Sequence, residues 1–486
     1  MSNESNSTQL KDIEVIKDNK NTNELDLSHK ILMKFNDDYF VNFESLVTAN
    51  LSYCNLKILP ESIFRLKKLE KLDISYNQIE MLQIEIGELD NLKELIVEGN
   101  PFLNLIPFNT MNESNEILEF FKNLNQPKPK PMQREFYPHL NHTKNQFIVM
   151  SYNILAQHCA DIQFRFPFTP KKFLKSNYRI PLIKDQIICN HPEIICLQEV
   201  ERQYFKIDFE PYFKHLGYQC FHCPKARAEK MNDENRINQV IGQATFIKTQ
   251  TFKVLGTKTM DLRNHPLCCT LPNYSELCNH DEIVLINIVK MNCSIPVVIA
   301  IVNIHLYWDC NEEFVRRSQL FIAIESAIDY ALTFTDKFDI ILAGDFNSTN
   351  SSSTLMYLES REECFINTYP LFHVYSLLPK LPSSIDHIFT TINGINPVSV
   401  LTLPDDKFIS ETYFTFPAQY FPSDHLPIAT TFQIKSQQSY RPFRNFIYKM
   451  NPDVYKPIQK YTITKPNKTR CKLTIKTQPQ SKPTNE

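Results

Sequence analysis

Eight polar side chains that can bind metal or phosphate stand where apolar, strand-like segments begin or end. They are Asn153, Glu199, His305, Asp345, Asn347, Asp386, Asp424 and His425. If they meet, two carboxylates about 4 Å apart repel by roughly 4 kcal/mol at an effective dielectric near 20, and a divalent cation removes that penalty. Oxygen ligands with an imidazole and no thiolate favour Mg²⁺ or Mn²⁺ over zinc. The set therefore predicts a metal-dependent reaction on a phosphate or similar anion.

Each of these residues also has a structural alternative. Asn153 could cap a turn, Glu199 could pair with a lysine, and His305 could be a hydrogen-bonded histidine of the core. Acidic and amide side chains at the edge of apolar strands are costly to desolvate, however. Their common placement at strand ends favours one shared site at the rim of a sheet.

The segment from Gly344 to Asn347 carries the strongest local signal. It follows the apolar run 340–343 and uses one of only seven glycines in 486 residues. Glycine permits a close backbone approach or unusual dihedral angles at this point. The i, i+2 spacing can place Asp345 and Asn347 on the same side of the chain.

Short, β-branched segments of strand length recur between residues 146 and 434, and two helical patterns interrupt them. We expect strands at 147–155, 193–197, 240–247, 283–289, 296–304, 338–343, 385–390, 398–403 and 427–434. We expect helices at 178–189 and 314–331. Strands mixed with helices in this way predict a layered α/β fold.

The N-terminal part contains an internal repeat. Units of the form Leu-x-x-Leu-x-Leu-x-x-Asn-x-Leu start at Leu46, Leu69 and Leu92, 23 residues apart, and a degenerate unit precedes them. This period predicts a leucine-rich-repeat solenoid of about four units, whose stacked neighbours cover one another's apolar faces. Asn77 and Asn100 can tie their side-chain amides to the backbone at the turns. A solenoid of this kind is either a protein-docking surface or a scaffold.

Composition divides the chain into five parts. We expect a disordered N-terminus at 1–21, the repeats at 22–125, a solvated Pro/Lys linker at 126–145, the α/β domain at 146–437 and a disordered basic tail at 438–486. The whole chain carries a net charge of −2, but residues 441–486 hold eleven Lys/Arg and two Asp/Glu, 11 − 2 = +9.

Targeting signals and regular cysteine spacing are absent from the sequence. The polar N-terminus has no apolar segment typical of a secretory signal, and no apolar run reaches the length of a membrane span. We therefore expect an intracellular protein without a membrane partner. Its thirteen scattered cysteines are expected to be thiols. The close pair Cys220 and Cys223 lacks a second pair at zinc spacing.

The order of the polar motifs resembles that of the endonuclease/exonuclease/phosphatase superfamily. The matching segments are Ser151-Tyr152-Asn153, Leu197-Gln198-Glu199-Val200, Asn303 with His305, Gly344-Asp345-Phe346-Asn347, Ile385-Asp386 and Ser423-Asp424-His425. Within that superfamily the chain resembles the carbon catabolite repressor type deadenylases, the leucine-rich-repeat nucleases of the Ccr-Not complex. The resemblance implies a repeat solenoid followed by a two-sheet α/β sandwich nuclease domain.

The resemblance also implies an activity and roles for the site residues. The reaction is in-line, Mg²⁺-dependent hydrolysis of poly(A) from its 3′ end, with release of 5′-AMP. Glu199 is the principal metal ligand, Asp345 binds metal and orients or deprotonates the attacking water, and Asn153 binds metal or phosphate. Asn347 and His425 complete the metal set. His425, oriented by Asp386 or Asp424, also stabilises the transition state, and His305 contacts the same phosphoryl group.

Substrate and partner contacts follow from the same resemblance. Trp308, Phe346 and Arg179 are candidate RNA contacts, because single-stranded RNA is held by aromatic faces and cations. For Arg179, which follows Tyr178 as in the Tyr-Arg pair of the family, a structural role is favoured over RNA contact. Phe164, Phe166 and Phe168 are further candidates, with core packing as the alternative. The repeats are expected to bind a second deadenylase subunit of the complex, in cytoplasm and nucleus.

The chain departs from the deadenylase pattern at two places. Ile241 stands where the family has an aspartate, and residues 381–384 replace a Phe-Lys-Gly-type segment associated with the adenine pocket. Two alternatives therefore stay open. The first is a related phosphodiesterase acting on 2′-5′ oligoadenylate or other RNA 3′ ends, and the second is a non-catalytic scaffold.

Overall fold

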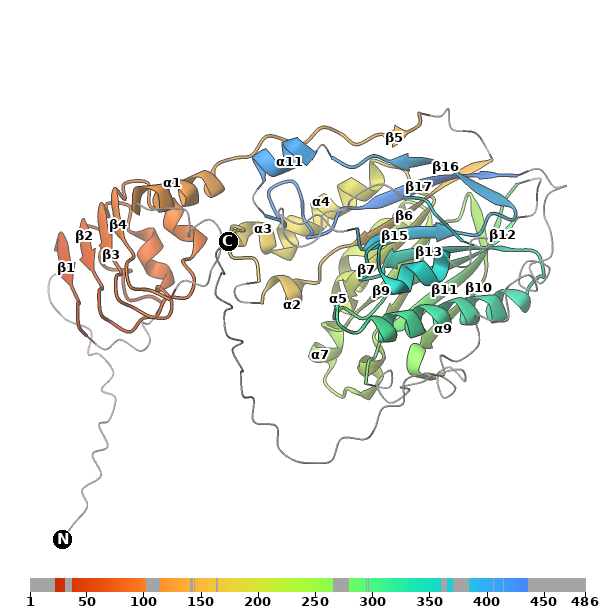
Figure 1. The fold of residues 1–486 in the computed structure, drawn as a ribbon, viewed down its shortest axis with the longest axis horizontal. Helices are drawn as coiled ribbons and strands as arrows, with labels where there is room; N and C mark the ends of the chain where they lie inside the picture. Colours follow the sequence, from red (N-terminus) through yellow and green to blue (C-terminus); the bar gives the residue numbers. More distant parts are fainter. Residues whose placement is uncertain are drawn as a thin grey trace, which may run out of the picture.

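The structure is a computed structural model in which two folded parts are visible (Figure 1). It describes residues 22–30, 37–101, 114–139, 143, 145–162, 165–264, 279–293, 295, 297–359, 365–369, 384–404, 406–413 and 415–435. The predictions of disorder at 1–21 and in the basic tail at 438–486 lie outside these residues.

The N-terminal part is a small parallel sheet. Its four strands lie in chain order: β1 (Glu24–Asp26), β2 (Thr48–Asn50), β3 (Lys71–Asp73) and β4 (Glu94–Ile96). Thr48 pairs with Lys71 and Lys71 with Glu94, so β3 and β4 each repeat their predecessor 23 residues later, whereas β2 follows β1 by 24 residues. The central residues Ala49, Leu72 and Leu95 are fully buried. The apolar period of the sequence thus becomes one continuous core.

A buried asparagine joins neighbouring turns of this sheet. The Asn77 side chain accepts hydrogen bonds from the backbone N–H of Cys54 (3.0 Å) and Leu56 (2.9 Å) and donates to the carbonyls of Leu51 and Ile74. Asn100 makes the corresponding contacts one turn later, with Ile79 N–H and Ile74 O. The predicted ties between asparagine amides and the backbone are confirmed.

Two sheets form the second part of the molecule. The six-stranded sheet has the order β10 (Phe252–Asp261), β11 (Ile283–Met291), β12 (Val298–His305), β13 (Asp339–Asp345), β15 (Asp386–Thr390), β14 (Ile366–Asn367). The seven-stranded sheet has the order β5 (Phe136–Tyr137), β16 (Ile395–Leu401), β17 (Ile428–Ile434), β6 (Gln146–Asn153), β7 (Ile194–Glu201), β9 (Ile241–Lys248), β8 (Tyr218–Pro224).

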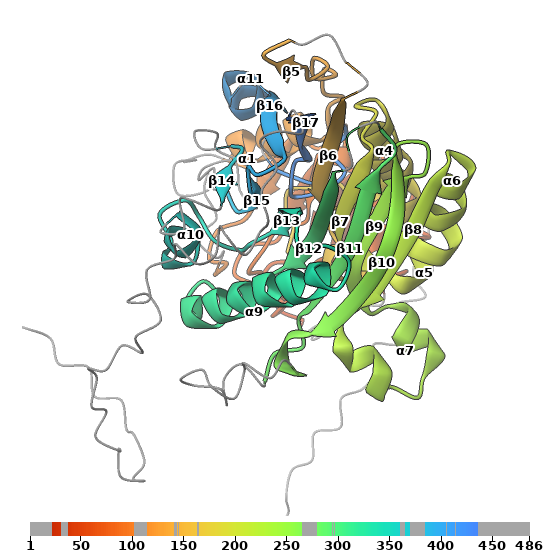
Figure 2. The same ribbon diagram turned by 90° about the vertical axis from the view of Figure 1, so that its right-hand side faces the viewer.

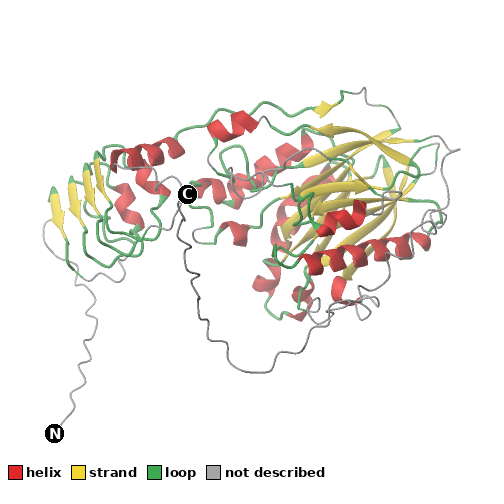
Figure 3. Ribbon diagram, in the orientation of Figure 1, coloured by secondary structure: helices red, strands yellow, loops and turns green. Residues whose placement is uncertain are grey.

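Helices lie outside the sheets (Figure 3). They are α1 (Ser114–Asn125), α2 (Gln157–Ala160), α3 (Lys171–Leu174), α4 (Ser176–Ile188), α5 (Arg202–Tyr204), α6 (Glu210–His215), α7 (Glu234–Asn238), α9 (Glu313–Leu332), α10 (Ser353–Glu359) and α11 (Asp406–Thr412). The two helices expected from sequence are confirmed as α4 and α9. Among the described residues, none of the helices has both the length and the apolar character needed to cross a membrane.

Alternating side chains divide the second part into layers. Ile299 and Ile301 of β12 pack into the core between the two sheets, whereas Ala300 and Val302 face α9. This alternation is the ordinary consequence of strand geometry. Figure 2 shows α9 on one side of the sheets and α4 with α6 on the other, so the layers run helix, sheet, sheet, helix. The predicted α/β class is confirmed.

The segment expected to be a solvated Pro/Lys linker is mostly exposed, and it also makes hydrogen bonds to the second part. Lys128 N–H donates to Gln419 Oε1 at 2.8 Å, and Arg134 donates to the carbonyls of Thr402 and Pro427. Residues 136–137 form β5, which pairs with β16. Free backbone groups at a sheet edge bind an adjacent extended chain, so this part of 126–145 becomes an edge strand.

The two parts contact each other through the segment before α4. Phe168 is buried among the apolar side chains of the N-terminal repeats, 5.8 Å from the Phe120 ring. Lys171 Nζ lies 2.6 Å from Glu61 Oε1 and 3.6 Å from Glu85 Oε1. For Phe168, core packing is therefore correct and RNA contact is not. Phe166 is likewise buried, in a small cluster with Leu155.

Candidate active site

Strand pairing brings the predicted residues of the six-stranded sheet to one edge. His305 lies opposite Asp345 in the parallel pair β12 and β13, and Asp345 lies opposite Asp386 in the antiparallel pair β13 and β15. A Cβ atom on Gly344 would stand 2.0 Å from the carbonyl oxygen of Ile304. Only glycine fits there, as the sequence indicated, because the neighbouring strand passes too close.

Asn153, at the end of β6, joins the other sheet to this edge. Its Nδ2 lies 3.2 Å from Glu199 Oε1 and 3.0 Å from Asp345 Oδ2, and its Oδ1 accepts the Leu155 N–H. Ser423 Oγ donates to the carbonyl of Asn153 at 2.7 Å. One buried amide thus holds two carboxylates from two different sheets within reach of a single ion.

The backbone around Glu199 aims its carboxylate at the site. Glu199 has a φ of 58° and lies at an irregularity in the pairing of β7 with β9. Such a bulge turns a side chain away from the regular alternation. Ala156 N–H donates to Glu199 Oε2 at 2.9 Å. Burial acts against the charged carboxylate, but nearby His305, this N–H and His425 outweigh it and lower the pKa of Glu199 to about 2.

His425 is held by Asp386. Its Nδ1 lies 2.7 Å from Asp386 Oδ2, whereas its Nε2 is 3.9 Å from Asp424 Oδ1 and 3.8 Å from Asp345 Oδ2. A carboxylate can only accept, so Nδ1 carries the proton and Nε2 faces the site. Of the two residues proposed to orient this histidine, Asp386 is the one in hydrogen-bond contact.

The charges of this cluster depend on one another. Burial opposes a charged imidazolium, but Asp386 outweighs it and raises the pKa of His425 well above its usual value. Burial, together with the charge of Asp386, raises the pKa of Asp345. Burial also raises the pKa of Asp424, whose Oδ2 lies 3.7 Å from Arg165 Nη2. The site is therefore rich in carboxylates that would be stabilised by a cation.

The residues present fit a hard divalent cation. Single ligand atoms of Asp345, Asp386 and His425 lie within 4.8 Å of one another. Asp386 Oδ1 is buried without a hydrogen-bond partner among the described residues, a condition that a bound ion or its water relieves. The available ligands are carboxylate oxygens without thiolate, which match Mg²⁺ or Mn²⁺, and His425 in its protonated form faces the same centre as a hydrogen-bond donor.

The remaining predicted contacts surround this centre. His305 Nε2 lies 3.6 Å from Asp345 Oδ2. Asn347 has a φ of 47°, donates its backbone N–H to Asp345 Oδ1 at 2.8 Å and donates Nδ2 to Leu306 O. Trp308, three residues beyond His305, is 69% exposed and presents its ring to solvent. Phe164 lies outside the described residues.

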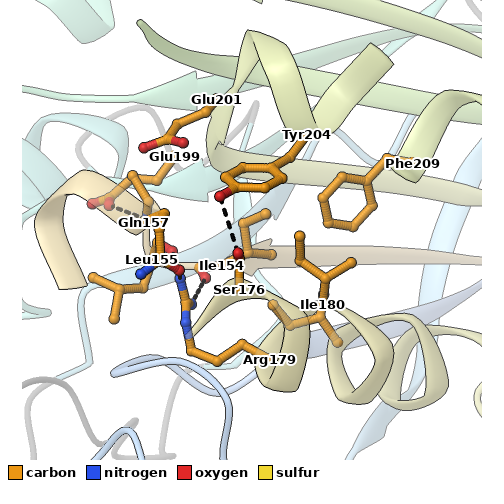
Figure 4. Close-up of a pocket in the computed structure, with 12 residues that line it drawn as sticks. Ile154, Leu155, Gln157, Ser176, Arg179, Ile180, Glu199, Glu201, Tyr204 and Phe209 are labelled. Atoms are coloured by element: carbon orange, nitrogen blue, oxygen red, sulfur yellow. Dashed lines mark hydrogen bonds between the residues drawn. The ribbon is translucent and has the colours of Figure 1, made fainter. Parts of the chain in front are cut away.

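Two predicted substrate contacts are corrected by the structure. All five N–H groups of buried Arg179 donate within the protein, and the acceptors are Leu174 O, Ile154 O, Pro422 O, Leu155 O and Gln157 Oε1. Figure 4 shows Arg179 reaching from α4 to the loop of Ile154 and Leu155. Arg179 therefore fixes the loop that holds Glu199. Phe346 is fully buried beside His387 and Phe389, so its ring cannot stack on a base.

Sequence reasoning missed one functional group for a physical reason. The Ala156 N–H that holds Glu199 is a main-chain group, and its side chain carries no chemical signal. Leu155 has a φ of 55° at the turn of this loop, and the sequence could not indicate it, because leucine rarely adopts a positive φ. Ser423, whose hydroxyl donates to the carbonyl of Asn153, could have been found from the sequence, because it belongs to the Ser423-Asp424-His425 motif.

Comparison with known proteins gives two relatives with about half of their length matched. The Schizosaccharomyces pombe protein named CCR4-Not complex 3'-5'-exoribonuclease subunit Ccr4 is 27% identical over 358 residues, 62% of this chain and 51% of that protein. The Saccharomyces cerevisiae protein of the same name is 25% identical over 408 residues, 71% of this chain and 48% of that protein. This chain thus spans about half the length of these curated relatives.

A solved structure shares the fold of the second part. The crystal structure of ANGEL2, a 2',3'-cyclic phosphatase, in complex with adenosine-2',3'-vanadate, superposes with a TM-score of 0.52 at 17% identity. The match covers 63% of this chain and 99% of that one. The model of the Endonuclease/Exonuclease/phosphatase family matches residues 150–425, more than half of the chain. The protein therefore belongs to the Endonuclease/Exonuclease/phosphatase family.

Proposed function

We propose that this protein is a Mg²⁺-dependent 3′-5′ exoribonuclease that shortens poly(A) and releases 5′-AMP, in cytoplasm and nucleus. The observation that carries the proposal is the convergence of Glu199, Asp345 and His425, from three distant segments of the chain, on one buried carboxylate-rich centre. The similarity to proteins named as Ccr4 exoribonuclease subunits supports the choice of RNA as the substrate.

The residues of the centre have separable tasks in this mechanism. Glu199 and Asp345 would hold the ion, which would supply Lewis-acid charge stabilisation and lower the pKa of water. Asp345 also orients the attacking water, since its Oδ2 faces the gap between His305 and His425. Asn153 keeps the two carboxylates together. Asn347, beside Asp345, is placed to complete the cation's ligands.

Two histidines serve the phosphoryl group. His425, held protonated by Asp386, places its Nε2–H where negative charge grows on the phosphoryl oxygens. His305, whose Nε2 lies 3.6 Å from Asp345 Oδ2, donates to the same group. The exposed ring of Trp308 offers a face on which a base of the RNA stacks.

A second candidate function remains, because the sequence departs from the deadenylase pattern at two places. Ile241 stands where the family has an aspartate; it is buried and pairs with Glu201 across β7 and β9. The altered segment 381–383 lies outside the described residues. Because both changes concern substrate recognition and not the metal centre, the alternative is a phosphodiesterase for 2′-5′ oligoadenylate or other RNA 3′ ends.

We expect poly(A) to be the preferred substrate. The experiment compares poly(A), mixed-sequence RNA and 2′-5′ oligoadenylate, each with Mg²⁺ and with EDTA, and measures released 5′-AMP. We expect turnover of poly(A) with Mg²⁺, at least about tenfold slower turnover of the other two, and none with EDTA, because the ion contributes several kcal/mol of transition-state stabilisation. Faster cleavage of 2′-5′ oligoadenylate selects the alternative, and inactivity on all three contradicts both.

We also propose that the N-terminal part is a leucine-rich-repeat solenoid that binds a second deadenylase subunit. The 23-residue period of β2, β3 and β4 and the Asn77 contacts support the repeat assignment. Tyr53 and Tyr76, 46% and 48% exposed, stack with ring centroids 4.5 Å apart and offer a preformed aromatic surface. Tyrosine is frequent among the residues that dominate binding energy at protein interfaces.

Replacing both tyrosines with alanine should remove the partner and leave hydrolysis unchanged. We expect the affinity of the full chain for the second deadenylase subunit to fall at least about tenfold, as interface tyrosines contribute upwards of 1 kcal/mol each. Tyr137→Ala is the matched control, because Tyr137 is 65% exposed on β5, in the other part of the molecule. Undiminished pull-down by the Tyr53→Ala/Tyr76→Ala chain would place the docking surface elsewhere.

A further inference from the structure

A cysteine, a histidine and a glutamate form a hydrogen-bonded chain beside the active centre. Cys159 Sγ lies 3.4 Å from His158 Nε2, and His158 Nδ1 lies 2.7 Å from Glu201 Oε1. Cys159 and His158 belong to the short helix α2, and Glu201 ends β7. None of these three residues has a task in the proposed hydrolysis.

The glutamate is fixed in its acceptor role. Its side chain is 1% exposed, and its oxygens accept from His158 N–H at 2.9 Å and from Gln203 Nε2 at 2.9 Å, in addition to the imidazole. Because these hydrogen bonds are all donated to Glu201, its carboxylate holds the proton of His158 on Nδ1, and Nε2 faces the Cys159 thiol.

The hydrogen bonds of His158 favour the protonated form of its imidazole. Hydrogen bonds with Cys159 and with Glu201 raise the pKa of His158 to about 10. The order carboxylate, imidazole, nucleophile is the arrangement by which enzymes activate a thiol or hydroxyl. Transfer of a thiol proton to an imidazole gives the thiolate, which is the reactive form of cysteine.

The other described cysteines lack such a neighbour. Burial raises the pKa of the Cys196, Cys220 and Cys223 thiols to about 12. Cys189 and Cys310 are exposed, but for neither is a histidine within hydrogen-bond distance among the described residues. Cys159 is half-buried, with its sulfur beside Leu155 and Phe166 and its histidine 39% exposed. A small reagent can reach it from the His158 side.

We propose that Cys159 is an activated thiol that small hydroperoxides oxidise to a sulfenic acid. The thiol proton moves to His158 Nε2, and the thiolate sulfur attacks one oxygen of the peroxide. An S–O bond forms as the O–O bond breaks, so sulfur loses two electrons and the peroxide gains two. The leaving hydroxide or alkoxide takes the proton back from His158 and departs as water or alcohol. The product, Cys–SOH, can be reduced by thiols.

The modified sulfur would lie next to the catalytic loop. Cys159 N–H donates to Ala156 O, and Ala156 N–H is the group that holds Glu199. Gln157, in the same turn of helix, accepts a bond from Arg179. The site of oxidation is thus two hydrogen bonds from the metal-binding carboxylate.

The test follows the chemistry of the thiol and does not depend on nuclease activity. The full-length protein is treated with substoichiometric iodoacetamide at pH 7, and separately with hydrogen peroxide plus dimedone, and each cysteine is quantified by mass spectrometry. We expect Cys159 to be alkylated about tenfold faster than the more exposed Cys189 and Cys310 and to carry most of the dimedone. Equal or slower reaction of Cys159 overturns the proposal without any variant.

Two variants separate activation from simple accessibility. His158→Gln should lower the Cys159 alkylation rate about tenfold and leave Cys189 and Cys310 unchanged, because the amide cannot accept the thiol proton. Cys159→Ser should abolish the dimedone adduct on this peptide. An unchanged Cys159 rate in a His158→Gln protein that melts like the wild type would overturn the activation mechanism.

Discussion

Replacing Asp345 with asparagine should reduce phosphodiester turnover by at least about 10³-fold, the equivalent of about 4 kcal/mol in the barrier. Asp345 Oδ2 accepts from Asn153 and lies within 4 Å of His305 and His425, so this oxygen is shared by three groups of the proposed centre. An amide nitrogen at this position supplies neither the charge for the cation nor an acceptor for water. The measurement is the initial rate with saturating Mg²⁺.

The same substitution should leave the fold intact. Burial and the charge of Asp386 raise the pKa of Asp345, which means that its ionised form is destabilised in the folded protein. Removing the charge therefore relieves repulsion, and we expect an unchanged or slightly higher melting temperature. Glu199→Gln should instead lower the melting temperature, because the lowered pKa of Glu199 means that its charged form is stabilised in the folded protein.

The matched control for both variants neutralises a carboxylate far from the centre. Asp208→Asn serves, since Asp208 lies 3.4 Å from Lys184 on the outer helices. It should retain wild-type turnover. A folded Asp345→Asn protein with more than a tenth of wild-type turnover would remove the mechanism, whereas loss of folding in Asp208→Asn would show that the comparison is unsuitable.

Replacing Asn77 with alanine should destabilise the N-terminal part by about 4 kcal/mol. The change leaves two buried backbone N–H groups, those of Cys54 and Leu56, without their acceptor, at about 1–3 kcal/mol for each unsatisfied group. It also removes the donor to Leu51 O and Ile74 O. Hydrogen exchange of the amides in β2 and β3 is the suitable readout, because the single tryptophan, Trp308, lies in the other part.

Asn100→Ala is the graded control for that experiment. Asn100 has the same role one turn later, but among the described residues its Oδ1 accepts from one N–H, that of Ile79, and the site is half-buried. We expect a loss of about 1–2 kcal/mol for this single unsatisfied donor. Equal losses in the two variants, or none in Asn77→Ala, would contradict the account of how neighbouring turns are joined.

Much of the architecture could be predicted from local pattern. The 23-residue period of apolar positions indicated the stacked parallel strands, and the apolar runs ending at Asn153, His305 and Asp345 coincide with the ends of β6, β12 and β13. Strand periodicity and apolar burial depend on a few neighbouring residues, so they can be recognised in the sequence as a local pattern. The need for glycine at position 344 could be predicted for the same reason, because Gly344 directly follows an apolar run in the sequence.

Other features depended on contacts between distant segments. Arg179 and Phe346 were predicted to face the substrate, yet one binds carbonyls up to 243 residues away and the other packs beside Phe389. A cationic or aromatic side chain suits either task, and only its surroundings decide between them. The Pro/Lys segment was expected to be solvated along its length, but its residues 136–137 pair with the edge of β16 as strand β5.

The sequence by itself determined which residues could do metal and phosphate chemistry and roughly where the strands and repeats would lie, because residue type and periodicity are local properties. The tertiary structure decided that Asp386 and not Asp424 orients His425, that a backbone N–H holds Glu199, and that Cys159 meets His158 and Glu201. These are hydrogen bonds of about 3 Å, and strand register and loop dihedral angles set which partner lies at that distance.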